Sequence, residues 1–293
     1  MADASPLDSD WLRDNPLPQP PRGADKNARG RVFMIGGCTR VPGGLLLTAE
    51  AALRAGAGKV QLATAASTAM ALGVAMPEIA VWPLAEDGEG EIASRLDGVA
   101  EDIRRSDAVV AGPAMSCGEA AGRVVDQLLD GLCEKSTLIL DAAALMTLPA
   151  RARPLAARAS PAVLTPHIGE MAAMLACDAA EIEADRRGAV RRAAELYGAI
   201  VVLKGPTSFV ADPHGKLFTF AGGGVGLATG GSGDVLAGLA AGLAARGADS
   251  LVATAWAVWL HGEAGRRCAE QIGPLGFLAR ELLAHVPALM RAV

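Results

Sequence analysis

Short apolar runs alternate with helical segments from residue 31 to about residue 205, and this alternation constrains the fold most. Each run has the length of a strand and ends at glycine, proline or a polar residue. The strands predicted in this way are Arg31–Ile35, Lys59–Thr64, Glu78–Trp82, Ala108–Ala111, Thr137–Leu140, Ala162–Thr165 and Ala199–Leu203. The helices predicted between them are Leu45–Ala55, Ile92–Arg105, Glu119–Cys133 and Ala180–Tyr197. This order predicts an α/β fold, a doubly wound and mostly parallel sheet with helices on both faces.

The two ends of the chain extend this plan. Thr207–Ala211 and Leu217–Phe220 flank the turn Asp212-Pro-His-Gly215, which predicts a small antiparallel extension of the sheet, and Asp234–Arg291 is expected to be mostly helical. Residues 1–25 are polar and proline-rich and are expected to form an arm over the surface. No linker interrupts the chain after residue 30, so residues 26–293 are expected to form a single domain.

Composition excludes several classes of partner. The formal net charge is −5 and the chain has no basic run, which disfavours nucleic acid and anionic membranes as partners. The five cysteines are scattered without a C-x-x-C pair, so neither a disulfide framework nor a zinc site is expected, and a cytoplasmic location fits. The apolar stretch Leu251–Leu260 is too short to span a bilayer.

Polar residues and glycines follow one predicted strand after another. They are Gly36–Thr39, Gly112-Pro113, Asp141, Thr165–His167 and Lys204–Thr207. Parallel strands bring their carboxyl ends to one edge of a sheet, where ligands of such folds bind. The sequence therefore predicts one site at that edge.

The glycine-dense loop Gly222–Gly233 ends at Asp234, directly before a predicted helix at Val235–Arg246. Glycines allow backbone N–H groups to approach an anion closely, and a helix start adds free N–H donors. The loop lacks the lysine of a P-loop and the G-x-G-x-x-G of a dinucleotide fold. It predicts phosphoryl transfer to a hydroxyl, with Asp234 taking the proton. A structural turn with Asp234 as the N-cap of the helix is the alternative.

Taken together, the motifs resemble the ADP/ATP-dependent NAD(P)H-hydrate dehydratase family. The most specific segments are Leu164-Thr-Pro-His-Ile-Gly-Glu170, Val202-Val-Leu-Lys-Gly205 and Gly226-Leu-Ala-Thr-Gly-Gly-Ser-Gly-Asp-Val-Leu-Ala-Gly238. The resemblance covers about residues 28–290. Many bacterial members carry a fused epimerase domain, for which this chain is too short, so a standalone form is expected. The resemblance implies a three-layer αβα ribokinase-like fold.

The resemblance also implies a repair reaction and its cofactors. The substrate would be hydrated NADH or NADPH, and ADP or ATP with Mg²⁺ would phosphorylate the ring hydroxyl so that phosphate can leave. Asp234 would be the general base, and Gly231, Ser232 and Gly233 would hold the transferred phosphoryl group. The implied nucleotide segment is Lys204, Gly205, Pro206, Thr207 and Ser208. The implied substrate contacts are Gly44, Ala114, His167 and Asp234.

Some implied roles have structural alternatives. Asp141 either approaches Mg²⁺ through water or is a strand-end turn residue. Glu170 either does the same or caps a helix that begins near Ile168, and His167 either contacts substrate or is a structural histidine.

The substrate side departs from the family pattern. Asp141-Ala-Ala-Ala-Leu-Met146 replaces Asp-Ala-Asp-Ala-Leu-Asn, and Gly112-Pro-Ala-Met-Ser116 replaces Gly-Pro-Gly-Leu-Gly. Two alternatives are therefore kept: an ATP-dependent kinase of another small alcohol, and a non-catalytic nucleotide-binding protein. A homo-oligomer is expected, with Leu251–Leu260 as either an interface or core.

Overall fold

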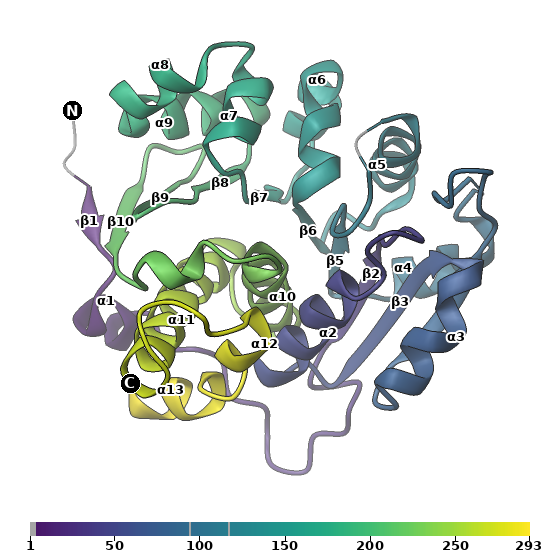
Figure 1. Ribbon diagram of the computed structural model, residues 1–293, viewed down its shortest axis with the longest axis horizontal. Coiled ribbons are helices and arrows are strands. Elements are labelled where there is room, and N and C mark those ends of the chain that lie inside the picture. The colour runs from purple at the N-terminus through teal and green to yellow at the C-terminus, as the bar shows by residue number, and fades with distance from the viewer. Residues whose placement is uncertain (1–3, 94, 117) are drawn as a thin grey trace.

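The structure is a computed structural model that describes residues 4–93, 95–116 and 118–293. These residues form one ten-stranded sheet, seen across the middle of Figure 1. In spatial order the strands are β1 (Ser5–Pro6), β10 (Leu217–Ala221), β9 (Thr207–Ala211), β8 (Ile200–Leu203), β7 (Val163–Leu164), β6 (Thr137–Leu140), β5 (Ala108–Ala111), β2 (Arg31–Ile35), β3 (Lys59–Ala65) and β4 (Ala80–Leu84). Strand β9 is antiparallel to both of its neighbours, and all the remaining neighbouring strands are parallel to each other. The predicted mostly parallel sheet with an antiparallel extension is confirmed.

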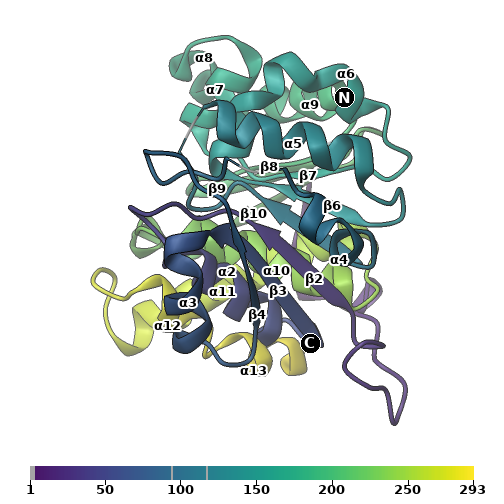
Figure 2. The same cartoon turned by 90° about the vertical axis from the view of Figure 1, so that its right-hand side faces the viewer.

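Helices cover both faces of the sheet and make three layers (Figures 1 and 2). One face carries α2 (Gly44–Arg54), α3 (Ala66–Ala75), α10 (Ser232–Ala245), α11 (Ser250–Gln271), α12 (Ala279–Leu282) and α13 (Val286–Ala292). The other carries α4 (Ala100–Arg104), α5 (Glu119–Gly131), α6 (Ala152–Ala156), α7 (Ile168–Leu175), α8 (Ala179–Ala184) and α9 (Arg186–Tyr197).

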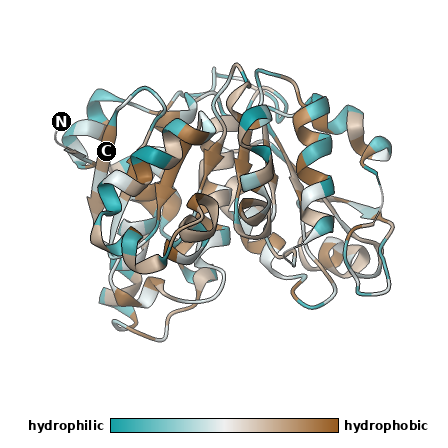
Figure 3. Cartoon of the chain, turned by 90° about the horizontal axis from the view of Figure 1, so that it is seen from above, coloured by the Kyte–Doolittle hydropathy of each residue, from teal (hydrophilic) through white to brown (hydrophobic). Residues whose placement is uncertain are grey.

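Each face of the sheet has its own hydrophobic core. Along β2, Val32 and Met34 face one core while Phe33 and Ile35 face the other, because successive side chains of a strand point to opposite faces. Apolar strands therefore line the middle layer, seen from above in Figure 3. Strands buried on both faces explain why the predicted strands appear as continuous apolar runs rather than alternating ones.

Small residues bring α10 unusually close to α2. A Cβ added to Gly238 would lie 2.2 Å from the Thr48 carbonyl oxygen, and one added to Gly242 would lie 2.4 Å from that of Ala52. Both distances are too short for a side chain, so the glycines are required by the packing. This contact fixes the first turn of α10 beside the first turn of α2.

The N-terminal segment, predicted only as a polar surface arm, also contains regular structure. Strand β1 extends the sheet beside β10, and α1 (Ser9–Asp14) follows, capped by Asp8. Leu12 is fully buried, and Trp11 packs edge-on against Phe218 with ring centroids 5.3 Å apart. The Trp256 indole N–H donates to the Asn15 carbonyl oxygen at 2.8 Å. The apolar residues between the prolines anchor the arm.

Three predicted helices differ from the structure by three residues or more, whereas α2 and α5 differ from their predictions by one or two. Within the helix predicted at Ile92–Arg105, of which residue 94 lies outside the described residues, the structure has a 3₁₀ turn, Asp97–Val99, and the short α4. The helix predicted at Ala180–Tyr197 is broken at Asp185, whose side chain accepts from the Gly188 N–H and starts α9. The last predicted helix begins at Ser232, three residues earlier than expected.

Most of Leu251–Leu260 is buried in the hydrophobic core on the α10 face of the sheet, which is the second of the two predicted alternatives, while Leu251, Val252 and Trp259 are partly exposed. Nor is any helix in the described part of the chain long and apolar enough to cross a membrane.

Candidate active site

The carboxyl ends of β6, β7 and β8 meet in a network of buried polar groups. Asp141, which is 2% exposed, accepts from the Thr165 hydroxyl at 2.7 Å and from Lys204 Nζ at 3.1 Å. Lys204 Nζ also lies 3.7 Å from Glu170 Oε2. Burial alone would lower the pKa of Lys204, but the charges of Asp141, Glu170 and Asp234 raise it above its ordinary value. The ends of these strands therefore meet as predicted, and the positively charged Lys204 lies between the two carboxylates.

The glycine loop ends in a helix start that no side chain caps. Gly231 is the N-cap of α10 and has φ of +89°, a conformation that favours glycine. Asp234 is the third residue of the helix, so the alternative that it caps the helix is wrong. The N–H groups of a first helical turn have no intrahelical acceptor, and together with the helix dipole they favour an anion. Ser232 N–H instead donates to the Thr229 carbonyl oxygen at 3.3 Å.

Lys204 completes this anion site. A Cβ added to Gly233 would lie 3.2 Å from Lys204 Nζ and 3.7 Å from Asp141 Oδ2. The ammonium therefore sits directly against the backbone of the first turn of α10. A phosphate held there would meet both helix N–H donors and a positive charge.

Asp234 is half-buried, and its environment favours the protonated carboxyl. Burial raises its pKa, the Asp141 carboxylate raises it further, and Lys204 opposes both; the resulting pKa is about 7. An ordinary exposed aspartate is a poor proton acceptor near neutral pH. A pKa near 7 suits general-base chemistry, since the ideal catalytic pKa lies near the working pH.

Gly44 and Ala114, predicted as substrate contacts, lie together beside Asp234. A Cβ added to Gly44 would lie 2.9 Å from the Ala114 Cβ and 3.2 Å from Asp234 Oδ2. Ala114 has φ of +57°, a left-handed conformation that is costly for alanine. This strain gives a physical reason for glycine at that position in the family pattern. The structure therefore places these two predicted residues next to the predicted base.

His167 and Glu170 form a reciprocal cap at the start of α7. His167 Nδ1 accepts from the backbone N–H groups of Gly169 (3.0 Å) and Glu170 (3.2 Å), while Glu170 Oε2 accepts from the His167 N–H at 2.8 Å. The structural alternative predicted for each residue is thus present. The His167 side chain is 61% exposed, which leaves its outer edge open to a ligand.

In the segment Lys204–Ser208, the first three residues form the turn between β8 and β9, and Thr207 and Ser208 begin β9. Gly205 and Pro206 are exposed, and Arg186 supports the turn from its buried side. Arg186 Nη2 donates to the carbonyl oxygens of Lys204 (3.1 Å) and Thr207 (3.2 Å). A Cβ on Gly205 would overlap this guanidinium, at 2.1 Å from Nη2. Sequence reasoning missed Arg186 because its helix is rich in arginine, and nothing in the spacing distinguishes this one.

A second missed residue is His261 on α11. Its Nε2 lies 2.8 Å from Ser232 Oγ and 3.0 Å from the Ser232 carbonyl oxygen, at the start of α10. The sequence predicts no role for this histidine, because nothing near it along the chain marks it as part of the site.

Comparison with known proteins identifies the family. A family model described as NAD(P)H-hydrate dehydratase matches residues 32–288. The chain belongs to the NAD(P)H-hydrate dehydratase family. It is similar to the ADP-dependent (S)-NAD(P)H-hydrate dehydratase of Xanthomonas campestris pv. campestris, with 47% identity over 95% of this chain and 93% of that protein.

Two solved structures share the fold, and one of them is of a protein named for this family. The ADP/ATP-dependent NAD(P)H-hydrate dehydratase from Bacillus subtilis, co-crystallised with ATP and Mg²⁺, superposes with a TM-score of 0.82 at 25% identity, covering 100% of this chain and 99% of that one. A ribokinase-like superfamily protein from Enterococcus faecalis V583 gives a TM-score of 0.84 at 25% identity, covering 99% and 96%. The ribokinase-like three-layer fold implied by the resemblance is confirmed.

The carboxylates near this site suit a Mg²⁺ ion that is held mainly by the phosphates of a bound nucleotide. Among the described residues, no three His, Cys, Asp or Glu side chains cluster so as to hold a metal ion. Asp141 Oδ1 and Glu170 Oε2 both face Lys204, and Glu170 Oε1 lies 3.5 Å from His167 Nε2. Asp141 Oδ2 and the outer side of Glu170 Oε1 are therefore the positions where water could bind. Mg²⁺ commonly keeps several waters and binds through substrate phosphates with one or two carboxylates. Asp141 and Glu170 fit that water-mediated arrangement.

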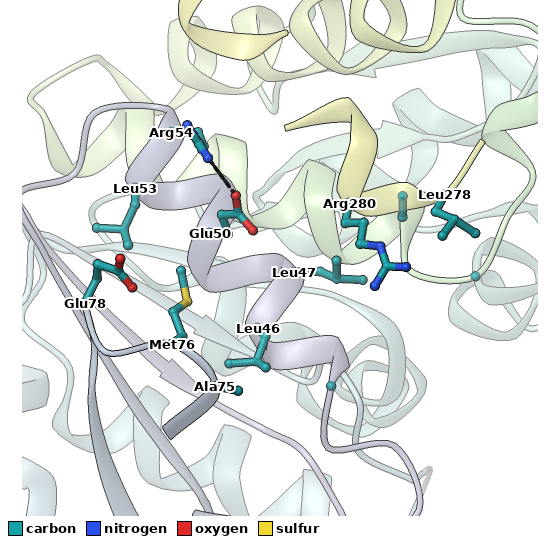
Figure 4. Close-up of a pocket in the computed structure, with 13 residues that line it drawn as sticks. Leu46, Leu47, Glu50, Leu53, Arg54, Ala75, Met76, Glu78, Leu278 and Arg280 are labelled. Carbon is teal, nitrogen blue, oxygen red and sulfur yellow. Dashed lines mark hydrogen bonds and ion pairs between the residues drawn. The ribbon is translucent and has the colours of Figure 1, made fainter. Parts of the chain in front are cut away.

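A groove of about 940 Å³ adjoins the site between α2, α3 and α12 (Figure 4). Leu47 lines it, and the Leu47 Cδ1 lies 2.4 Å from where a Cβ on Gly231 would be. Farther along lie Arg280 and the ion pair of Glu50 with Arg54, at 3.1 Å. The groove thus reaches from the glycine loop across the outer face of α2.

Proposed function

We propose that this chain is an ADP- or ATP-dependent (S)-NAD(P)H-hydrate dehydratase, a hydro-lyase that restores NADH and NADPH from their hydrates. One observation carries the proposal: a half-buried aspartate with a pKa of about 7 stands in an anion-binding helix start, between a fixed lysine and a small-residue pocket. The 47% identity to the Xanthomonas enzyme supports the choice of substrate.

The reaction needs a leaving group better than hydroxide. Asp234 takes the proton of the ring hydroxyl. The hydroxyl oxygen of the substrate attacks the terminal phosphoryl group of ATP or ADP, and ADP or AMP is released. The C–O bond then breaks as the lone pair of the ring nitrogen moves into the ring, and phosphate leaves. Loss of one proton from the neighbouring carbon restores the dihydronicotinamide. The net change in the substrate is loss of one water.

The anion site supplies the electrostatics of the transfer. The N–H donors around Gly231 and Gly233 would stabilise charge on the transferred phosphoryl group, and Lys204 Nζ adds a fixed positive charge beside them. The Lys204–Ser208 segment, supported by Arg186, would hold the rest of the nucleotide. Mg²⁺, when bound with the nucleotide, would neutralise phosphate charge. Asp141 and Glu170 would hold its waters.

The substrate ring is proposed to lie against Gly44 and Ala114, where the Asp234 carboxylate is open to a hydroxyl. The exposed edge of His167 would contact the substrate from the α7 side. The remaining dinucleotide is much larger than this pocket, and the adjoining groove has the size to receive it, with Arg280 as a cation that, among the described residues, forms no ion pair with a glutamate of the groove.

The test is a direct assay. Purified protein is mixed with (S)-hydrated NADH, Mg²⁺ and either ADP or ATP, and the absorbance of reduced nicotinamide is followed. Recovery that requires nucleotide and is lost in Asp234→Asn supports the proposal, and the preferred nucleotide is then measured. Nucleotide binding without recovery contradicts it and indicates a kinase of another alcohol or a binding protein. The homo-oligomer and the cytoplasmic location stay predictions.

A further inference from the structure

Both oxygens of Ser232, the first residue of α10, face the same imidazole nitrogen. His261 Nε2 lies 2.8 Å from the hydroxyl oxygen and 3.0 Å from the carbonyl oxygen. His261 belongs to α11, a different helix in the same layer, and its imidazole makes both of these contacts through one nitrogen. The pair therefore ties the start of α10 to a long helix of which half the residues are buried.

The chemistry of the carbonyl group decides which ring nitrogen carries the proton. A carbonyl oxygen only accepts hydrogen bonds, so a nitrogen 3.0 Å away from it must carry the hydrogen. His261 Nε2–H then donates to the Ser232 carbonyl oxygen and, at 2.8 Å, also to Ser232 Oγ. The hydroxyl of Ser232 in turn keeps its own hydrogen for another acceptor.

Burial and charge favour this neutral tautomer. Desolvation lowers the pKa of His261, the bond to Ser232 raises it and the charge of Lys204 lowers it, with a result of about 4. Near neutral pH the ring thus has one N–H, and the geometry assigns it to Nε2. Ser232 itself is 6% exposed, so its oxygens are shielded from bulk water.

We infer that His261 is a positioning residue for phosphoryl transfer: its Nε2–H holds both oxygens of Ser232, fixes the first turn of α10, and leaves the Ser232 hydroxyl hydrogen for a nucleotide phosphate. The inference rests on the proposed function. That turn carries the N–H donors of Gly231 and Gly233 as well as Asp234, so small shifts would misalign donors and base together. Misplacement by about 1 Å can cost on the order of 100-fold in rate.

The experiment combines spectroscopy and kinetics. ¹⁵N NMR of the wild-type enzyme, with and without ADP, reports whether Nε2 of His261 is protonated. The kcat of the variants His261→Leu, His261→Gln, Ser232→Ala and the double variant Ser232→Ala/His261→Leu is then measured with hydrated NADH, alongside the Kd for ADP from calorimetry. His214→Gln, in the exposed turn after β9, is the control.

The expected result is a protonated Nε2 and a kcat lower by about 10- to 100-fold in His261→Leu, with the Kd for ADP changed by less than about threefold. Glutamine offers an N–H at a similar reach and should restore most of the rate. The double variant should be no slower than its slower parent, because the two residues act as one unit.

Three results would overturn the inference: an unprotonated Nε2, a normal kcat in His261→Leu, or losses that multiply in the double variant. The tautomer and the ADP affinity are measured without hydrated substrate. If the wild type binds ADP but does not restore NADH, the proposed function fails while the protonated Nε2 is still tested on its own.

Discussion

The two sides of Asp234 differ in how they are built. On one side lie three charged groups. Lys204 Nζ, at the end of β8, is 3.1 Å from Asp141 Oδ1 at the end of β6 and 3.7 Å from Glu170 Oε2 in α7. On the other side stand Gly44 and Ala114, which offer backbone and methyl groups only. The charged side sets the proton affinity of Asp234, whereas the small side sets the room in front of it. Electrostatics and shape can thus be changed separately, and the following variants do so.

The largest effect is expected for Asp234→Asn. An amide cannot accept the substrate proton, so kcat should fall by about 10²- to 10⁴-fold. The Kd for ADP should change little, because the helix N–H groups and Lys204 remain. Stopped assays with hydrated NADH and calorimetry with ADP measure the two quantities. A variant with more than about a tenth of the wild-type kcat would remove Asp234 from its proposed role.

Lys204→Met should disrupt the charged side as a whole. It leaves the buried Asp141 and Glu170 carboxylates facing each other without the cation, which should lower the free energy of unfolding by about 2–4 kcal/mol. Nucleotide binding should weaken by at least about tenfold. Urea unfolding and calorimetry test this. Lys216→Met, at an exposed position before β10, is the matched control, and equal losses in the two variants would contradict the role of Lys204.

Gly44→Ala should change the small side only. Its Cβ would lie 2.9 Å from Ala114 and 3.2 Å from Asp234, in the space assigned to the substrate ring. We expect kcat/KM for hydrated NADH to fall by about tenfold, with the Kd for ADP unchanged. At neighbouring Gly43 an added Cβ meets nothing within 4 Å, so Gly43→Ala is the control. A similar decrease of kcat/KM in both variants would mean that a change in the start of α2, and not the shape of the pocket, is responsible.

Asp141→Asn should shift the pH profile. The base works when deprotonated, so activity should rise with pH through the pKa of Asp234, about 7. Removing the Asp141 charge removes one cause of the raised pKa, while Lys204 still lowers it. The midpoint of the acid limb of kcat/KM should therefore move to lower pH. A midpoint that stays in place or moves upward would show that Asp141 does not tune the base.

The smallest effect is expected for Ala114→Gly. Glycine relieves the left-handed backbone at φ of +57°, and the free energy of unfolding should rise by up to about 1 kcal/mol. Ala176→Gly, at φ of +52° at the end of α7, is the control for strain away from the site. Thermal unfolding measures both. If only Ala114→Gly also changes KM for hydrated NADH, its methyl group is part of the pocket.

Much of the fold and part of the candidate site could be predicted from the sequence. The order of apolar runs predicted the strands, and the residues after them predicted the edge where Asp141, Thr165 and Lys204 meet. The bounds of helices were less predictable: Ile92–Arg105 has helical composition, but among its described residues the helices are only the 3₁₀ turn Asp97–Val99 and α4. Arg186 and His261 were missed because their roles depend on partners far away in sequence, which no local pattern encodes.

By itself, the sequence determined the α/β class, the glycine loop ending at Asp234 and the family resemblance, because strand length, turn residues and motif spacing are local properties. Only the tertiary structure decided that Gly44 faces Asp234, that Lys204 bridges two carboxylates and that His261 holds Ser232. It also raised the pKa of Asp234 to about 7. Proton affinity depends on burial and on charges brought near by folding, and those come from strands and helices widely separated in the chain.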